Sequence, residues 1–273
     1  MTDIGNLEIH VVHSCNLACE SCSHYSDQGH KGMLALAEAE RWMEAWARRL
    51  RPRTFSLLGG EPTLHPELPG FVALARAQWP AAHVRLVTNG FFLHRHPTLP
   101  AVLRRAGNAS IQVSIHHRAP DYLRKLEPVR ELLRGWVRDH GIRAELYDSF
   151  SNWTRRYHGS GSAMEPFDDG LPRQSWERCP ARHCPQLFEG KIWKCGPLAY
   201  LKLQAARYRL SGAWTPYLQY QPLKADCSDA QLAEFFGREE EPSCGMCPAN
   251  PARFTLPVPL RSVLLRHPAE APA

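Results

Sequence analysis

The first 150 residues alternate between short apolar segments and longer amphipathic stretches. The apolar segments have the length and aliphatic content of buried strands and lie at residues 7–12, 54–58, 84–87, 110–115 and 142–147. The stretches between them repeat apolar positions at helical spacing, over residues 34–50, 68–79, 97–106 and 120–138. Strands that alternate with helices predict parallel βα units, so we expect an α/β fold.

The pattern changes after residue 150. A polar, glycine-rich stretch at residues 149–170 predicts a loop that lies over the end of the βα units where the strands terminate. Residues 186–194 are typical of a β-hairpin that turns at Glu189 and Gly190. Residues 228–237 predict a helix, and Ser228 is its expected N-cap.

These changes divide the chain into three expected parts. Residues 1–178 form the βα units with their covering loop, and residues 179–250 form a small cysteine-rich module. Residues 251–273 are a proline-rich tail, and we expect its end to be disordered.

Composition and charge exclude several classes of protein. The chain has 273 residues, 44% of them apolar, and lacks an uninterrupted apolar segment long enough to cross a membrane. Its net charge of +6 is spread along the chain without a basic block, so we do not expect nucleic-acid binding. The first residues lack the features of a signal peptide, and we expect a cytoplasmic location. In that compartment, nine cysteines favour metal ligands over disulfides.

A cysteine triplet follows the first apolar segment. Cys15, Cys19 and Cys22 have C-x3-C-x2-C spacing, in the loop expected to leave the strand at residues 7–12. Closely spaced thiolates select iron–sulfur clusters, zinc or copper. A structural zinc site takes four ligands, whereas three thiolates on a 4Fe–4S cluster leave one iron open. A zinc knuckle and three unrelated thiols are the alternatives.

The second apolar segment at residues 54–58 runs directly into Gly59, Gly60, Glu61 and Pro62. The two glycines allow the backbone to approach a ligand closely, and Glu61 offers an acceptor for an ammonium group. Proline ends the strand. An ordinary turn is the alternative interpretation of these four residues.

Together, the triplet and the Gly-Gly-Glu-Pro turn resemble the signature of the radical SAM superfamily. The resemblance implies a partial (βα)6 barrel and a 4Fe–4S cluster whose open iron binds S-adenosylmethionine (SAM). Reductive cleavage of SAM then gives methionine and a 5′-deoxyadenosyl radical that abstracts a substrate hydrogen. Gly59, Gly60, Glu61 and Pro62 would hold the SAM amino group. Four residues at the ends of later strands are further candidates for SAM contact: Thr88, Asn89, Ser114 and His116.

The cysteines of the C-terminal module resemble the auxiliary-cluster modules called SPASM and Twitch. Gly190 and Cys195 have the Gly-x4-Cys spacing of the hairpin, and Cys244 and Cys247 form the distal Cys-x2-Cys. The resemblance implies a second 4Fe–4S cluster; a zinc ribbon is the alternative. The candidate ligands are Cys179, Cys184, Cys195, Cys244 and Cys247.

Five candidates for four ligand positions leave one cysteine over, and Cys227 is a further spare thiol. A cysteine outside both clusters could return a hydrogen atom to a substrate radical, and Cys247 or Cys244 is the expected donor. The alternative is a buried, inert thiol.

The layout resembles the small Twitch enzymes of aminoglycoside pathways, which include a 2-deoxy-scyllo-inosamine dehydrogenase and a neomycin epimerase. We expect hydrogen abstraction from a sugar or aminocyclitol carbon, leading to epimerisation, with a flavodoxin or ferredoxin as reductant. Dehydrogenation with the second cluster as electron acceptor, modification of a ribosomal peptide, and a non-catalytic metal protein are the alternatives. The candidate substrate contacts are Asn152, Arg155, Arg156 and Tyr157.

Overall fold

The computed structural model describes residues 1–259, apart from the side chain of Asn152. The end of the expected tail, residues 260–273, lies outside the described residues. The strands are β1 Thr2–His10, β2 Leu50–Leu58, β3 His83–Thr88, β4 Ala109–Ile115, β5 Arg143–Asp148, β6 Gln186–Phe188 and β7 Lys191–Trp193. The α-helices are α1 Leu36–Ala47, α2 Leu68–Gln78, α3 Leu99–Ala106, α4 Pro120–His140, α5 Pro172–Glu177, α6 Gly196–Arg207, α7 Thr215–Leu218 and α8 Asp229–Gly237.

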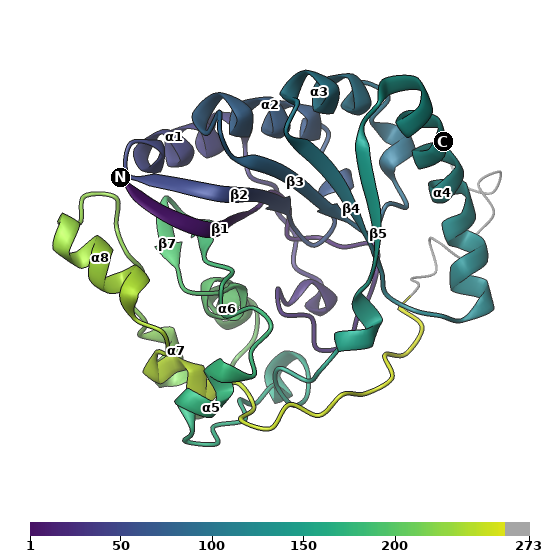
Figure 1. The fold of residues 1–273 in the computed structure, drawn as a ribbon. Coiled ribbons are helices and arrows are strands. Elements are labelled where there is room, and N and C mark those ends of the chain that lie inside the picture. Colours follow the sequence, from purple (N-terminus) through teal and green to yellow (C-terminus); the bar gives the residue numbers. More distant parts are fainter. Residues whose placement is uncertain (260–273) are drawn as a thin grey trace.

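Within the described residues, the seven strands form one sheet in the order β5-β4-β3-β2-β1-β6-β7. All neighbours are parallel except β6 and β7, which are antiparallel. The sheet does not close, because β5 and β7 remain at opposite ends of it (Figure 1). The predicted α/β fold, an open and partial barrel, is confirmed.

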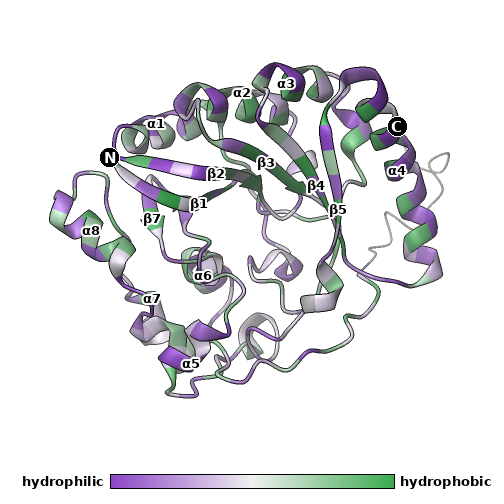
Figure 2. Ribbon diagram, viewed as in Figure 1, coloured by the Kyte–Doolittle hydropathy of each residue, from purple (hydrophilic) through white to green (hydrophobic). Residues whose placement is uncertain are grey.

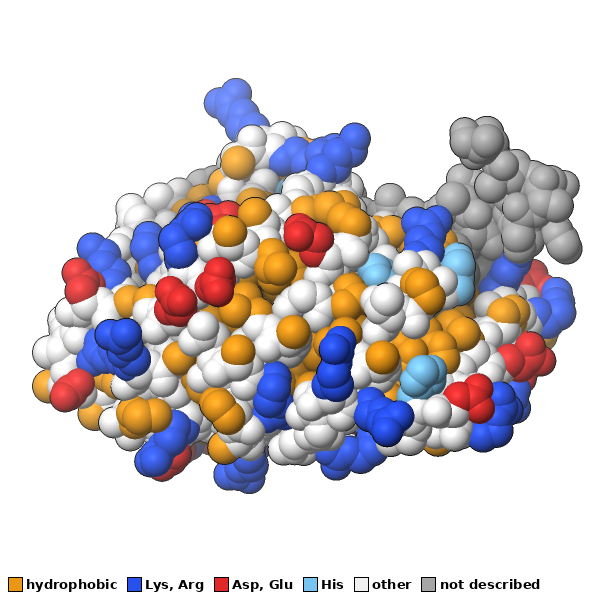
Figure 3. Space-filling view, turned by 90° about the horizontal axis from the view of Figure 1, so that it is seen from above, with side chains coloured by type: hydrophobic (Ala, Val, Ile, Leu, Met, Phe, Trp, Pro, Cys, Tyr) orange, Lys and Arg blue, Asp and Glu red, His pale blue; other side chains and the backbone are white. Residues whose placement is uncertain are grey.

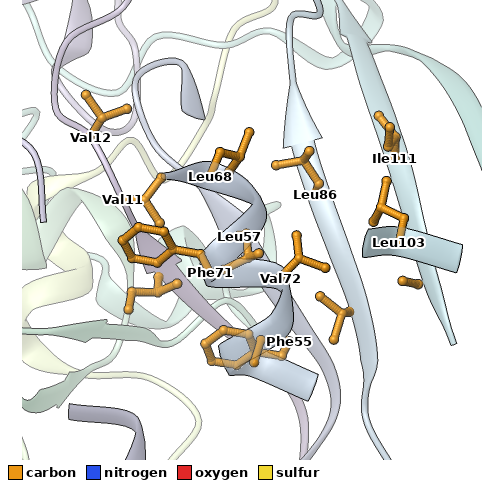
Figure 4. Packing of buried hydrophobic residues seen from close by; sticks show 14 of the residues in the cluster. Val11, Val12, Phe55, Leu57, Leu68, Phe71, Val72, Leu86, Leu103 and Ile111 are labelled. Atoms are coloured by element: carbon orange, nitrogen blue, oxygen red, sulfur yellow. The ribbon is translucent and has the colours of Figure 1, made fainter. Parts of the chain in front are cut away.

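Helices α1–α4 cover one face of the sheet, and α5–α8 lie on the other side (Figure 1). The main core lies between the sheet and the first set of helices, where Phe71 and Val72 of α2 pack beside Leu57 of β2 (Figure 4). In α4 the buried residues recur at helical spacing: Tyr122, Leu126, Val129, Leu133 and Trp136. Figure 2 shows the matching alternation of hydrophobic and hydrophilic residues along this helix.

The element boundaries differ most from the sequence expectation at the start of β1, the end of α1 and the start of β2. The first helix ends at Ala47 rather than residue 50, and β2 begins at Leu50 rather than residue 54. The cause is pairing with β1, which already begins at Thr2 and places Thr2 opposite Leu50. Pro52 is tolerated inside β2 because β3 pairs with β2 only from Thr54 onward, so this part of the strand has one neighbour.

The predicted hairpin is present, and it belongs to the main sheet. Its first strand, β6, lies parallel to β1 with Gln186 opposite Glu8. The turn residues Glu189 and Gly190 have φ values of 52° and 69°, the left-handed conformation that a two-residue hairpin turn requires. The predicted N-cap of α8 is also confirmed, since Ser228 and Gln231 form a capping box.

No helix among the described residues is long and apolar enough to cross a membrane. On the face shown in Figure 3, Lys and Arg side chains are interspersed with acidic and uncharged ones. This arrangement agrees with the spread of charge noted in the sequence.

Candidate active site

The loop that carries the cysteine triplet is anchored to the glycine turn by backbone hydrogen bonds. The N–H of Gly60 donates to the carbonyl of Val12 at 2.8 Å, and the N–H of Glu61 donates to that of Ser14 at 2.9 Å. A Cβ atom on Gly60 would lie 2.2 Å from the carbonyl oxygen of Ser14. The glycine is therefore required by the chain's own approach to the cysteine loop.

A cavity of about 190 Å³ lies at the C-terminal ends of the parallel strands. Its lining includes nearly all of the residues expected at the SAM and first-cluster site: Cys15, Cys19, Cys22, Gly59, Gly60, Glu61, Thr88, Asn89, Ser114 and His116. Pro62 is buried next to this lining, at the start of a short 3₁₀ helix, Pro62–Leu64. Sequence reasoning missed other lining residues, among them His24 and Ser149. Only the position of His24 within the cysteine loop could have suggested one of them.

Glu61 is the most constrained side chain of this cavity, with 1% of its surface exposed. Its Oε1 accepts hydrogen bonds from the N–H of Thr63 at 3.0 Å and from the hydroxyls of Thr63 and Thr88. Its Oε2 accepts a hydrogen bond from the N–H of Asn89 at 2.7 Å. Burial raises the pKa of Glu61, whereas these donors favour the ionised form. The carboxylate therefore joins the end of β2 to the end of β3.

Asn89 extends this network to the cysteine loop. Its side-chain N–H donates to Oδ1 of Asn16 at 2.7 Å, and the amide of Asn16 donates back at 3.4 Å. The same Nδ2 of Asn89 lies 3.9 Å from Sγ of Cys15. Asn89 was expected to contact SAM, which stays a prediction; the structure places it beside Cys15, an expected ligand of the first cluster.

His116 forms another part of the cavity wall. Its Nδ1 lies 3.2 Å from the hydroxyl of Ser149, and Trp153 packs edge-on against its ring. Burial lowers the pKa of His116 from 6.5 to about 4. The imidazole is therefore neutral at pH 7. Ser114, near the end of β4 and two residues before His116, is buried and lines the cavity too.

A group of histidines lies beside the cysteine loop, and sequence reasoning missed it. His10 and His13 share a hydrogen bond of 2.8 Å between their Nδ1 atoms, and His24 stacks on His10. Burial and mutual repulsion lower the pKa of His10, and they lower that of His13 to about 4. These rings are neutral packing elements at pH 7.

The expected substrate residues after β5 contact the cysteine loop. Arg155 forms an ion pair with Glu20, and the N–H of Arg156 donates to the Ser21 hydroxyl at 2.7 Å. Tyr157 is buried and donates its hydroxyl proton to Asp27. The side chain of Asn152 lies outside the described residues. These contacts attach the covering loop to the triplet, and substrate binding by the four residues stays a prediction.

Four of the C-terminal cysteines meet at a second, smaller cavity of about 40 Å³, lined by Cys179, Cys195, Cys244 and Cys247. Cys195 caps α6, and the short 3₁₀ helix Pro242–Met246 holds Cys244. Burial raises the pKa of Cys195 well above its ordinary value, and the other three thiols raise it further. The four thiols thus border the same cavity.

The fifth candidate ligand lies elsewhere. Cys184 contacts Glu8 and Asn6 of β1, and both burial and Glu8 raise its pKa. Cys227 is bound by Arg49, whose Nη1 lies 3.1 Å from its Sγ. The expectation that Cys247 or Cys244 is the hydrogen donor rested on an unplaced fifth cysteine. With Cys184 placed apart, that reason for separating Cys247 from the other ligands disappears.

No disulfide joins any of the nine cysteines. Within residues 1–259, no three side chains of metal-ligating type converge closely enough to hold a single metal ion. The thiols of both groups instead border cavities.

The family model of the radical SAM superfamily matches residues 9–142. This part of the chain is a radical SAM domain. It contains the end of β1, the strands β2–β4, the cysteine triplet and the ends of β2, β3 and β4 that line the first cavity. The resemblance inferred from the triplet and the glycine turn is thereby confirmed, whereas the resemblance to Twitch and aminoglycoside-pathway members is not.

Curated relatives of the radical SAM domain are named GTP 3′,8-cyclases. The probable enzyme of Pyrobaculum aerophilum is 31% identical over 140 residues, which cover 48% of this chain and 43% of that protein. The enzyme of Heliobacterium modesticaldum is 29% identical over 147 residues, which cover 53% of this chain and 43% of that protein. The chain thus spans less than half the length of these relatives.

Solved structures with a similar fold include BtrN in complex with AdoMet and 2-DOIA. It is 18% identical with a TM-score of 0.46, covering 78% of this chain and 85% of BtrN. SuiB of Streptococcus suis bound to S-adenosylmethionine is 15% identical with a TM-score of 0.43, covering 54% of this chain and 36% of SuiB.

Proposed function

We propose that the chain is a radical SAM enzyme whose first cavity holds a 4Fe–4S cluster on Cys15, Cys19 and Cys22, together with SAM. The observation that supports this most is the convergence of three thiols and the ends of β2, β3 and β4 on one cavity. The donor set fits, because soft thiolates suit iron–sulfur clusters and three of them leave one iron for another ligand. When bound, this pair of cofactors supplies a 5′-deoxyadenosyl radical.

The residues around the cavity then have distinct roles. Glu61 holds Asn89 and the end of β3 in place, and Asn89 orients Asn16 beside Cys15. Oε1 of Glu61 takes three hydrogen bonds and Oε2 takes one, so a further donor such as the SAM ammonium group would meet Oε2. His116 offers a neutral ring to the cavity, and Trp153 packs edge-on against that ring.

The second cavity would hold another 4Fe–4S cluster on Cys179, Cys195, Cys244 and Cys247. Four thiolates complete the coordination, so this cluster has no open iron and its role is electron transfer. When bound, it supplies a one-electron acceptor. Because no cysteine of this group stands apart, we favour dehydrogenation of a small molecule over epimerisation. In that reaction the substrate loses one hydrogen atom, then one electron and one proton.

A sugar or aminocyclitol alcohol is the substrate class we propose, with a cytoplasmic flavodoxin or ferredoxin as reductant. The cyclisation of GTP named for the relatives is carried out by proteins that are more than twice as long as the matched part, so we do not transfer it.

Anaerobic reconstitution tests the proposal. The protein should bind about eight irons and, once reduced by dithionite, should convert SAM to 5′-deoxyadenosine. Changing Cys15, Cys19 and Cys22 together to alanine should abolish this conversion and remove about half of the iron. Cys227→Ala is the matched control and should change neither. Wild-type protein that binds iron but forms no 5′-deoxyadenosine would refute the proposal.

Dehydrogenation and epimerisation are separated by the product formed from a panel of aminocyclitols and sugars in deuterated water. A product lighter by two hydrogens and without solvent deuterium supports dehydrogenation. A product that carries one deuterium at an inverted carbon supports epimerisation instead.

A further inference from the structure

Tyr25 lies between the two cysteine sites. Its backbone N–H donates to the carbonyl oxygen of Cys22 at 2.9 Å, within the first site. Its phenol O–H donates to the carbonyl oxygen of Pro197 at 3.0 Å, two residues after Cys195 of the second site. One residue thus connects a ligand-bearing segment of each site, through one backbone and one side-chain hydrogen bond.

The surroundings of Tyr25 exclude water and keep the ring in place. The residue is 1% exposed, and the Tyr157 ring lies 5.3 Å away, between ring centroids. Both rings belong to a buried cluster against which Cys195 and Cys247 pack. Burial and the charges that Cys247, Cys195 and Cys22 would carry raise the pKa of Tyr25, which agrees with a position between the two sets of thiols.

The backbone at Tyr25 is unusual for its residue type. Its φ of 55° is left-handed, a conformation that a bulky aromatic residue seldom adopts. Such conformations persist where the surrounding structure requires them, and they are common at functional sites. Here, the conformation allows the backbone to bond to Cys22 while the side chain reaches α6.

We propose that Tyr25 is the bridging residue for electron transfer between the two proposed clusters. One electron leaves the second cluster, which is oxidised, and enters the first cluster, which is reduced; no bond is made or broken. The tyrosine itself is not oxidised. Oxidation of a phenol releases its proton, and the Tyr25 phenol is hydrogen-bonded to an amide carbonyl, which is too weak a base to accept that proton. This inference rests on the proposed two-cluster function.

The test measures the movement of an electron rather than turnover. Reconstituted full-length protein is flash-reduced with less than one electron per chain, frozen at a series of times, and examined by EPR. Variants that lack the ligands of one site supply the reference spectrum of the other cluster. Iron and sulfide content of the wild type is determined first; a second site without an iron–sulfur cluster would overturn both this inference and the two-cluster proposal.

Tyr25→Phe removes the hydrogen bond to Pro197, and Tyr25→Leu also removes the ring. Both variants should reach the wild-type final distribution of the electron, but more slowly, and Tyr25→Leu should be the slowest. Tyr200→Phe is the control, since Tyr200 is equally buried in the same cluster and its hydroxyl bonds to Gln186 at 2.9 Å instead. It should redistribute the electron as fast as the wild type.

If Tyr25→Leu fails to assemble both clusters, the milder Tyr25→Phe decides the question. Redistribution at the wild-type rate in the loaded Tyr25 variants would overturn the inference. A changed final distribution at an unchanged rate would also overturn it, because Tyr25 would then set cluster potentials rather than carry the electron.

Discussion

Replacing Glu61 by glutamine should destabilise the cofactor-free protein, even though the two side chains have nearly the same shape. The carboxylate accepts the Thr63 N–H at one oxygen and the Asn89 N–H at the other. A glutamine amide has one oxygen and one NH₂ group. It can therefore accept a hydrogen bond from only one of these two backbone N–H groups. The other N–H then faces a donor inside a buried site.

The size of the effect follows from that conflict. A buried donor without an acceptor costs about 1–3 kcal/mol, and a hydrogen bond to a charged group contributes about 1.5–3 kcal/mol. Burial of the carboxylate opposes this, since it raises the pKa of Glu61 and glutamine avoids the cost of burying a charge. We therefore expect a net loss of about 1–3 kcal/mol, a large share of the stability of a typical domain.

Urea unfolding of the cofactor-free protein, followed by tryptophan fluorescence, measures this loss as a lower midpoint at an unchanged slope. Glu67→Gln is the control, because Glu67 is exposed just beyond the same turn, and it should stay within about 0.5 kcal/mol of the wild type. SAM affinity is measured alongside. Wild-type stability in Glu61→Gln combined with lost SAM affinity would refute the reasoning, since Glu61 would then act on the ligand alone.

Three further predictions concern other parts of the two sites. Gly60→Ala should lose the first cluster and keep the second, because the new Cβ would lie 2.2 Å from the Ser14 carbonyl oxygen; Gly5→Ala, with no atom within 4 Å, should keep the full iron content. Cys184→Ala should bind as much iron as the wild type and Cys179→Ala about half, whereas the reverse result would mean that the wrong four thiols have been assigned. The pKa of His116 is lowered from 6.5 to about 4 in the folded state, so the unfolded state binds the proton first as the pH falls. The free energy of unfolding should therefore be fully retained above pH 6.5 and decrease by about 3 kcal/mol toward pH 4. His116→Gln should reduce this decrease. His94→Gln, a change at an exposed position, should leave the decrease as it is in the wild type. An equal decrease in all three proteins would show that His116 is not the group responsible.

The parallel βα units and the place of the first site could be predicted from the sequence. Alternating apolar segments and amphipathic stretches determine parallel βα units, and parallel strands end at the same edge of a sheet. Residues at the ends of separate strands or in the loops that leave them, such as Cys15, Glu61 and Thr88, were therefore expected to meet. Local signals were equally reliable, as the capping box at Ser228 and the turn at Gly190 show.

The tertiary structure decided which groups the residues at that edge contact or hydrogen-bond. The sequence suggested that Gly60 and Glu61 face a ligand, which stays a prediction. The structure adds that the carbonyl of Ser14 requires a glycine at position 60 and that Glu61 holds Thr63, Thr88 and Asn89. The sequence shows that position 61 holds a carboxylate, which can accept hydrogen bonds. Only the approach of β3 to this turn determines which donors reach it.

The assignment of the C-terminal cysteines also depended on packing. The five thiols are separated by up to 68 positions, and their spacing in the sequence does not tell which of them lie close together in the fold. The loops between them are long enough to allow several arrangements. The hairpin adds to β1, which carries Cys184 to Glu8, while α6 and the 3₁₀ helix Pro242–Met246 bring Cys195 and Cys244 together. In the same way, Tyr25 comes between the two sites only because α6 packs beneath the cysteine loop, a contact between residues 172 positions apart.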